Sequence, residues 1–489
     1  MKLFGIFFYI SLLTSCAVGP NYQAPSPKVP DSFTAIENNK KSSIQLDNFG
    51  KIQEAWWVEF GDPTLTKLIH TAIHQNMDIN MAIQRVLEAR ASLQQVNSTF
   101  FPHIGTHASA HRASVSKNSS SPLVPLAQMG GTGFTLNSFD VGFATDWQLD
   151  IFGHITKRNE AATANVGVTR EQFHQANLVV ISEVASSYFM LRGLQKRLQI
   201  TQSHILTQEK TLDIVFNKYK TGLVSELDVS QARANLTLSK SKLPNFNAQV
   251  KQHIYRLSVL LGYFPTQLEK DLAVFAPLPQ LPSKISLGLP KNILINRPDL
   301  RTAERSLAKR SAEIGIATAE LYPKFSLSAL LGLSSLSTNH LFSNDSQTWS
   351  LTSGLQWPIF HAGELKAGIR AANTRFNAAY IAYQHAVLIA LEDVEGNAVS
   401  FNAELNRFHQ LRDTLKSAKR SVKLSQILYE KGLAEFLAVL ESERSLLEIE
   451  DLFIQSNTQR FIKLVSLYKS LGGGWRAFND HHDATLVSH

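Results

Sequence analysis

The chain has 489 residues, a single cysteine and a formal net charge of +8. Charged residues make up 18% of it, below the roughly 25% of ordinary soluble proteins, and its Lys and Arg residues are scattered along the chain. Because a nucleic-acid interface needs a patch of cations that contact phosphates, the composition excludes nucleic acid as the expected partner.

The first residues have the pattern of a secretory signal peptide, predicted at 1–15. Lys2 precedes an apolar run, Leu3 to Leu13, that is too short to span a bilayer as a helix. Small residues then precede Cys16, which resembles the acylated cysteine of a bacterial lipobox; the alternative is an unmodified cysteine. Acyl chains would anchor the chain, since each buried CH₂ contributes about 0.8 kcal/mol. Ala17, where an Asp would signal inner-membrane retention in such lipoproteins, favours the outer membrane.

Residues 17–55 contain Pro20, Pro25, Pro27 and Pro30 among polar residues, which predicts an extended lead-in rather than a packed element. The lipid-anchored N-terminal segment as a whole is predicted at 16–60. A helix is expected to begin at Asp62-Pro63, with apolar positions continuing towards Phe100. Phe101-Pro102 ends it, because proline cannot continue a helix.

Four short segments then alternate with a period of two, which predicts strands with one apolar and one polar face. They are residues 103–112, 139–148, 324–333 and 349–357. Their lengths are those of tilted transmembrane strands whose second face meets water. The alternative is a small soluble sheet, which would not need aromatic residues at its strand ends.

His103, His107 and His111 share one face of the first segment. Successive members lie about 13 Å apart at 3.3 Å per residue, too far to hold one metal ion. We therefore interpret the histidines as the lining of a polar lumen.

A stretch of the chain recurs after 210 residues: Tyr219-Lys-Thr-Gly222-Leu223 returns as Tyr429-Glu-Lys-Gly432-Leu433. Repeats decide architecture before local motifs do, and this one predicts two equivalent helical hairpins with glycine caps at their turns, at 158–262 and 363–472. The predicted organisation is a first repeat at 61–263, a Pro-rich linker at 264–290, a second repeat at 291–475 and a disordered tail at 476–489.

A heptad seam supports each hairpin. In the first copy it runs through Ile181, Val184, Tyr188, Leu191, Gln195, Leu198, Gln202, Ile205, Glu209, Leu212, Phe216 and Tyr219. A sustained 3.5-residue repeat predicts left-handed coiled-coil packing. One helix over 158–220 would be about 95 Å long at 1.5 Å per residue, more than a globular domain requires.

Four strands cannot form a transmembrane barrel, because open edges in lipid leave backbone groups unpaired and single-chain barrels begin at eight strands. Three chains would supply twelve strands and twelve long helices. The predicted fold is therefore mostly α with a small transmembrane β part, closed into a β-barrel and an α-barrel only as a homotrimer, and its function class is a conduit.

The sequence also resembles a known family, the TolC-like outer-membrane factors, and in particular their lipidated branch serving tripartite RND efflux pumps. The matching motifs are Cys16-Ala-Val-Gly-Pro20-Asn-Tyr22-Gln-Ala-Pro25, Trp56-Trp57-Val-Glu-Phe60-Gly-Asp62-Pro63-Thr-Leu65, Trp147-Gln-Leu-Asp150-Ile-Phe152-Gly153, Asn296-Arg297-Pro298-Asp299-Leu300-Arg301-Thr-Ala-Glu304 and Leu471-Gly-Gly-Gly-Trp475. The resemblance implies a homotrimer in the outer membrane that extends into the periplasm, where it meets a membrane-fusion adaptor and an inner-membrane RND pump.

The resemblance also implies site residues. A pore gate, made of an apolar ring and an acidic ring, falls on Leu437 and Glu441, where the family usually has Asp; three carboxylates converging on one axis would favour bound cations. Alternatively, Leu437 is a packing residue and Glu441 a solvated one. The adaptor-contact tips fall on Gly222, Leu223, Val224, Ser225, Gly432, Leu433, Ala434 and Glu435. Ordinary helix-turn chemistry is the alternative for these eight residues.

The leading interpretation is a passive exit duct for drugs or other small solutes. One alternative is the outer-membrane component of type I protein secretion, against which the lipobox and the motif at Asn296 argue. Another is a structural periplasmic lipoprotein without a pore. No enzyme, metal site or cofactor is predicted, because the chain has no phosphate-binding glycine loop and no cysteine besides Cys16.

Overall fold

The computed structural model describes residues 17–34, 45–47, 54–115, 134–282, 284–286 and 290–478. The predicted signal peptide, Cys16 and most of the predicted tail lie outside these ranges. The chain forms two compact units. The sheet unit takes its described residues from Met1–Pro25, Glu88–Gly167 and Glu304–Ala382, and the hairpin unit takes them from Ser26–Leu87, Val168–Ala303 and Tyr383–His489. Each unit draws on both sequence repeats.

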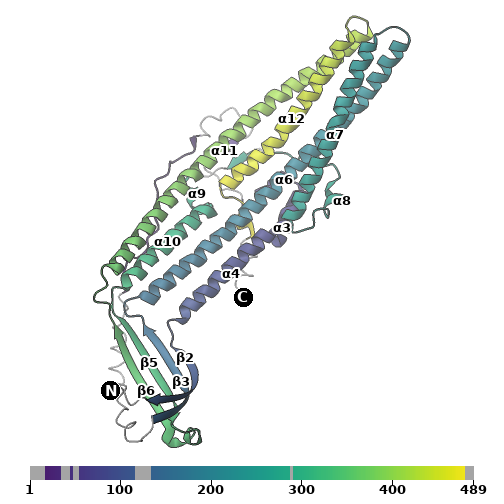
Figure 1. Ribbon diagram of the computed structural model, residues 1–489. Helices are drawn as coiled ribbons and strands as arrows, with labels where there is room; N and C mark the ends of the chain where they lie inside the picture. The colour runs from purple at the N-terminus through teal and green to yellow at the C-terminus, as the bar shows by residue number, and fades with distance from the viewer. Residues whose placement is uncertain are drawn as a thin grey trace. The chain divides into compact units, whose positions relative to one another are not determined.

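A four-stranded antiparallel sheet dominates the sheet unit (Figure 1). Its order is β2-β3-β5-β6, with bounds β2 His103–Val115, β3 Phe134–Leu149, β5 Lys324–Ser335 and β6 Gln347–Gln356. The strands contain nearly all of the four predicted segments, and β2, β3 and β5 are longer than predicted. The added residues of β2 and β3 pair with one another, Ala113 with Leu136 and Ser114 with Thr135, so backbone pairing continues beyond the predicted segments.

The strand register aligns the apolar face across the sheet. Phe143 pairs with Leu331, which pairs with Trp349, so that three large apolar side chains form one row. These side chains are 57%, 65% and 76% exposed, respectively. Exposure of a contiguous apolar face marks an interaction surface, and on a strand of alternating character it is the face that lipid would cover.

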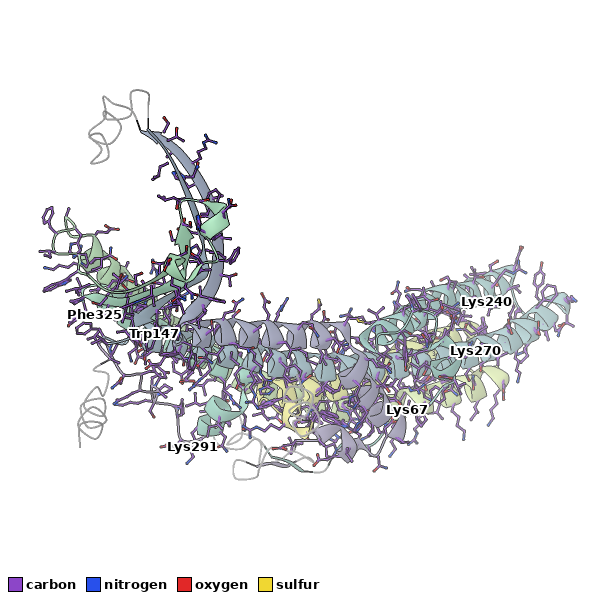
Figure 2. All side chains as sticks on the ribbon, turned by 90° about the horizontal axis from the view of Figure 1, so that it is seen from below. Lys67, Trp147, Lys240, Lys270, Lys291 and Phe325 are labelled. Atoms are coloured by element: carbon purple, nitrogen blue, oxygen red, sulfur yellow. The ribbon has the colours of Figure 1, made fainter. Side chains whose placement is uncertain are left out.

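A tryptophan fixes each hairpin of strands to the segment before it. The indole of Trp147 on β3 donates to the carbonyl of Phe100 at 3.0 Å, and that of Trp357 after β6 donates to the carbonyl of Leu321 at 3.1 Å. Each acceptor precedes a proline by two residues. Figure 2 labels Trp147 and Phe325 at the end of the sheet where β3 ends and β5 begins.

The helix expected from Pro63 towards Phe100 is two helices, α3 Pro63–Gln75 and α4 Met77–Ser98. Asn76 separates them: its backbone is extended, and its Oδ1 accepts from the amides of Asp78 and Ile79 at 2.9 and 3.1 Å. Its Nδ2 donates to the carbonyl of Leu260 at 2.8 Å. Asn76 therefore caps the second helix, which an apolar periodicity cannot reveal.

The hairpins consist of α6 His154–Lys220 with α7 Glu226–Leu260, and of α11 Glu364–Glu430 with α12 Phe436–Ser470 (Figure 1). Both copies pair a helix of 67 residues with one of 35. α9 Pro290–Asn296 and α10 Pro298–Ala319 precede β5. Among the described residues, no helix combines the length and the apolar character that a membrane-spanning helix needs.

The segment between the repeats contains structure of its own. α8 Glu269–Leu272 lies within the predicted linker, and β4 Lys284–Ser286 pairs in parallel with β1 Gln45–Asp47. Short 3-10 helices complete the fold at η1 Trp56–Phe60, η2 Thr338–His340, η3 Asn344–Ser346 and η4 Trp475–Phe478.

The predicted seam of the first hairpin is wrong at alternate positions towards the tip. The structure buries Thr201, Gln208 and Val215, whereas their neighbours in the predicted seam, Gln202 and Phe216, are exposed. Spacings of three then four and of four then three both satisfy a 3.5-residue repeat. Which of the two sets of positions is buried depends on the helices that pack against α6.

The core of the hairpin unit gathers motifs from distant parts of the chain. Trp56 stacks on Tyr468 with ring centroids 5.0 Å apart, and its indole donates to the carbonyl of Gly473 at 3.3 Å. Trp475 donates to the carbonyl of Asn296 at 2.8 Å. The Trp56, Asn296 and Leu471–Trp475 motifs therefore meet as structural elements of one core.

Candidate functional site

The two hairpin turns have nearly identical backbones. Gly222 and Gly432 adopt φ values of +75° and +72°, in the left-handed region that favours glycine. The next residue in each turn donates its amide five residues back, Leu223 to Lys218 at 2.9 Å and Leu433 to Leu428 at 2.8 Å. This hydrogen bond defines the Schellman helix end, so the repeated glycine serves the same turn in both copies.

The turns also present matching surfaces. Leu223 and Leu433 are each 73% exposed, although both are apolar. Val224 and Ala434, which follow them, are half-buried. Each tip therefore exposes one leucine above a packed neighbour, and the structure places all eight predicted tip residues at the two turns.

The tips differ in how the returning helix begins. Ser225 forms a capping box with Asp228, the serine hydroxyl accepting from the Asp228 amide at 3.4 Å and the carboxylate accepting from the Ser225 amide at 3.0 Å. Glu435 occupies the same position before α12 and makes no side-chain capping hydrogen bond. The first turn of α12 thus lacks a stabilising contact that α7 has.

A small apolar cluster joins the two hairpins behind their tips. It contains Val215, Val229, Ala232, Phe436, Val439 and Leu440, from α6, α7 and α12. Lys218 of the first hairpin lies over the ring of Tyr429 in the second, 4.2 Å from its centroid. The two tips of one chain are therefore packed together.

Both predicted gate residues line a groove between α7 and α12, with a volume of about 310 Å³. Its lining residues are Gln231, Ala234, Asn235, Leu238, Leu437, Leu440, Glu441 and Arg444. Leu437 is 47% exposed and Glu441 is exposed. Gln231 is the first-copy equivalent of Glu441, so positions related by the repeat lie along a single groove.

The repeat is asymmetric in charge within this groove. Glu441 and Arg444 belong to α12, whereas α7 contributes uncharged Gln231 and Asn235. Asn235 Nδ2 is enclosed and has no hydrogen-bond partner within the described residues. Arg444 and Asn235 were not among the predicted site residues, although their spacing from Leu437 and Gln231 on the two helices places them on the same helix faces.

A buried carboxylate deeper in the hairpins and its two cationic neighbours were also missed. Glu450 of α12 contacts His204 Nε2 at 2.6 Å and Lys419 Nζ at 3.1 Å. Burial raises the pKa of Glu450, but its hydrogen bonds to His204 and Lys419 outweigh burial, and the pKa lies below its usual value. The heptad pattern counts apolar positions, so it gave no signal for an ionic contact among these three residues.

Glu443 lies two turns earlier on the same helix, and its carboxylate has fewer hydrogen-bond partners than that of Glu450. Gln426 donates to its Oε1 at 3.1 Å, while its Oε2 is enclosed without a hydrogen-bond partner within the described residues. Burial raises the pKa of the Glu443 carboxyl above its usual value, and the Gln426 hydrogen bond offsets only part of that effect.

The Asn296–Glu304 motif is explained by packing. Arg297 Nη2 donates to Asp299 at 2.7 Å and to Asp393 at 3.0 Å, and its Nη1 donates to the carbonyl of Ser470 at 3.1 Å. The guanidinium thereby joins α10, α11 and the end of α12. Across the part of the chain that the structure describes, no group of three or more His, Cys, Asp or Glu side chains is arranged to hold a metal ion.

A sheet with one exposed apolar face and two equivalent long hairpins define the class of TolC-like outer-membrane channels. The solved structure of the outer-membrane channel OprN superposes with a TM-score of 0.87 at 29% identity, covering 94% of this chain and all of that one. The "Outer membrane efflux protein" family model matches residues 68–263 and 289–473. The chain belongs to this family, and the two matched stretches correspond to the two repeats.

Curated relatives agree over nearly the whole length. Nodulation protein T of Rhizobium leguminosarum bv. trifolii is 27% identical over 469 residues, 96% of each chain. The solvent efflux pump outer membrane protein SrpC of Pseudomonas putida is 28% identical over 474 residues, 96% of this chain and 97% of its own. The chain is thus an outer-membrane component of an efflux system, as its sequence predicted.

Proposed function

We propose that the chain is the exit duct of a tripartite efflux system, a homotrimer that passively conducts small solutes. The observation that carries this proposal is the sheet: β2 and β6 are its outer strands, and their outward backbone groups have no partner strand within the described residues. Such edges are not tolerated in lipid. Three copies joined edge to edge would leave none.

The N-terminal segment supports a lipid anchor on Cys16. The amide of Val18 donates to the carbonyl of Phe152 at 3.2 Å, and buried Lys157 donates to the carbonyl of Pro20 at 3.3 Å. Ala17 therefore lies beside the junction between β3 and α6. An acyl chain on the preceding residue would enter the bilayer next to the end of a membrane strand.

The tips support docking of a periplasmic membrane-fusion adaptor. Two equally exposed leucines on turns of nearly the same backbone conformation are an apolar surface of the kind that protein partners cover. The adaptor would link the channel to an inner-membrane RND pump, which supplies energy and selects the solutes. Leu437 and Glu441 would close the periplasmic end, because they project from α12 at the tips.

Planar-bilayer conductance of the purified protein tests this function. We expect small conductance from the unmodified protein and at least tenfold more from Leu437→Ser/Glu441→Gln, since the change removes both apolar closure and charge. Leu227→Ser/Gln231→Ala is the matched control at the equivalent positions of the first copy, and its conductance should stay within about twofold of the unmodified protein. Absence of channels from every variant would refute the conduit.

The anchor has a separate test in cells. Labelled palmitate should enter the unmodified protein and be absent from Cys16→Ser, because Cys16 is the only cysteine in the chain. Incorporation of label into Cys16→Ser would show that the anchor assignment is wrong.

A further inference from the structure

The charges on the four membrane strands lie almost entirely on the polar face of the sheet. That face carries His103, His107, His111, Asp140, Asp146 and Lys324. The remaining charged strand residue, Arg112, belongs to the opposite face near the far end of β2, and β6 contributes none. Under the proposed function this polar face lines the lumen, so its summed charge acts directly on passing ions.

The two carboxylates are held by neutral groups. Asp140 accepts hydroxyl hydrogen bonds from Ser334 at 2.6 Å, Ser138 at 2.8 Å and Ser109 at 3.2 Å. Asp146 accepts from Ser328 at 2.8 Å. No described cation forms a salt bridge with either carboxylate, so both contribute their full negative charge to the face.

The histidines are placed to add positive charge to the same surface. His103 lies directly opposite Asp146 in the β2–β3 register. His107 lies opposite Gly142, which itself lies opposite Gly332, so no side chain of β3 or β5 occupies that row. Among the described residues, His107 Nδ1 has no hydrogen-bond partner. His111 lies opposite neutral Ser138.

Lys324 is neutralised at the rim of the sheet. Its Nζ contacts Glu320 of α10 at 2.6 Å, and Glu320 also contacts His154 of α6 at 2.9 Å. The opposite charges of Lys324 and Glu320 cancel at any pH at which both side chains are ionised. The net charge of the polar face is therefore set by the two carboxylates, Asp140 and Asp146, and by how many of the three β2 histidines are protonated.

We propose that His103, His107 and His111 set the ion selectivity of the lumen and invert it with pH. With neutral histidines the face carries two negative charges per chain. Protonation of all three changes this to one net positive charge, because histidine is the side chain whose charge ordinarily changes between pH 5 and pH 8, where carboxylates stay ionised. The lumen is then cation-selective above neutral pH and anion-selective near pH 5.

This proposal rests on the proposed function and is tested in the open variant Leu437→Ser/Glu441→Gln, whose gate carries no titrating carboxylate. The measurement is the reversal potential under a KCl gradient at pH 8 and pH 5. A change of roughly one kT in the lumen potential alters the K⁺ to Cl⁻ permeability ratio about sevenfold, because cation and anion respond oppositely. We expect a fall of that size on acidification, from a ratio above one at pH 8 to a ratio below one at pH 5.

Three further variants identify the responsible groups. His103→Gln/His107→Gln/His111→Gln should leave the permeability ratio within about twofold between pH 8 and pH 5. The matched control His154→Gln removes a histidine at the rim and should keep the full shift. Asp140→Asn/Asp146→Asn should make the channel anion-selective on acidification and nearly non-selective at pH 8.

The outcomes separate this proposal from the function on which it rests. Channels whose selectivity does not respond to pH, or whose response survives the triple histidine change, would overturn the proposal and leave the conduit intact. If His154→Gln lost the pH-dependent change in permeability ratio, the proposal would also be overturned, because the responsible histidine would lie at the rim of the sheet. A complete absence of current would refute the conduit and, with it, the proposal.

Discussion

Glu450 and Glu443 lie seven residues apart on α12, both buried, and differ in their partners. Glu450 has a cation or potential cation at each oxygen, whereas Glu443 has a neutral amide at one oxygen and no partner within the described residues at the other. A buried carboxylate is favourable only when its charge is compensated. The two residues should therefore respond oppositely to the same substitution.

We expect Glu450→Gln to destabilise the protein by about 2 kcal/mol at pH 7, because hydrogen bonds to a charged group are lost. The folded-state pKa of Glu450 lies below its usual value, so its stabilisation is present above the unfolded pKa and disappears as pH falls through the folded pKa. Denaturant unfolding of the detergent-solubilised protein at pH 7 and pH 4 measures the effect. An equal loss at both pH values would contradict this assignment.

Glu443→Gln should instead stabilise the protein at pH 7. The folded pKa of Glu443 is raised, so folding disfavours its ionised form, and stability falls as pH rises through the pKa. A neutral amide removes that cost. The same unfolding experiment provides the measurement, and a loss of stability at pH 7 would show that Glu443 has a partner the structure does not reveal.

Arg297 is a single residue whose side chain holds several helices together. Lys cannot reproduce its contacts with two carboxylates and a backbone carbonyl, because it lacks the planar fork of donors. Arg297→Lys should lower stability by about 3 kcal/mol. Arg310→Lys, at a half-exposed pair with Glu313, is the control and should cost less than about 0.5 kcal/mol. Similar losses in both variants would refute the architectural role.

At the scale of elements, the start of α12 is the point where the two hairpins differ. Glu435→Ser/Ala438→Asp would give the second tip the capping box of the first, since Ala438 is the equivalent of Asp228. We expect about 1 kcal/mol of added stability at this helix end. Slower amide hydrogen exchange over residues 436–439 is the readout. Unchanged exchange would mean that tip packing, rather than capping, controls this end.

At the scale of the whole molecule, the sheet must keep its close strand pairing if three copies are to complete it. A Cβ on Gly142 would lie 2.7 Å from the carbonyl oxygen of Leu331, whereas a Cβ on Gly105 would meet nothing within 4 Å. We therefore expect Gly142→Val to abolish the trimer and Gly105→Val to preserve it. Light scattering coupled to size-exclusion chromatography measures the mass of each. A trimer of Gly142→Val would show that assembly does not depend on this sheet.

The helical lengths, the tip glycines and the polar and apolar faces of the strands were predictable because each depends on local properties. A repeat that keeps its register requires helices of equal length in the two copies. A backbone with positive φ favours glycine, and alternation of apolar and polar residues places them on opposite faces of a strand. The family motifs identified the class of protein. The gate role of Leu437 and Glu441 and the anchor at Cys16 stay predictions, to be tested by bilayer conductance and palmitate labelling. The adaptor contact at the tips also stays a prediction.

The sequence by itself determined that this protein has two equal helical hairpins and the four strands of its larger sheet. Only the tertiary structure decided which side of α6 is buried near the tip, that Gln231 shares a groove with Glu441, and that Arg297 reaches Asp393 and Ser470. Periodicity is a property of one element, and neighbouring rows on a helix satisfy it equally. The row that is buried depends on partners distant in sequence, which only the folded chain brings together.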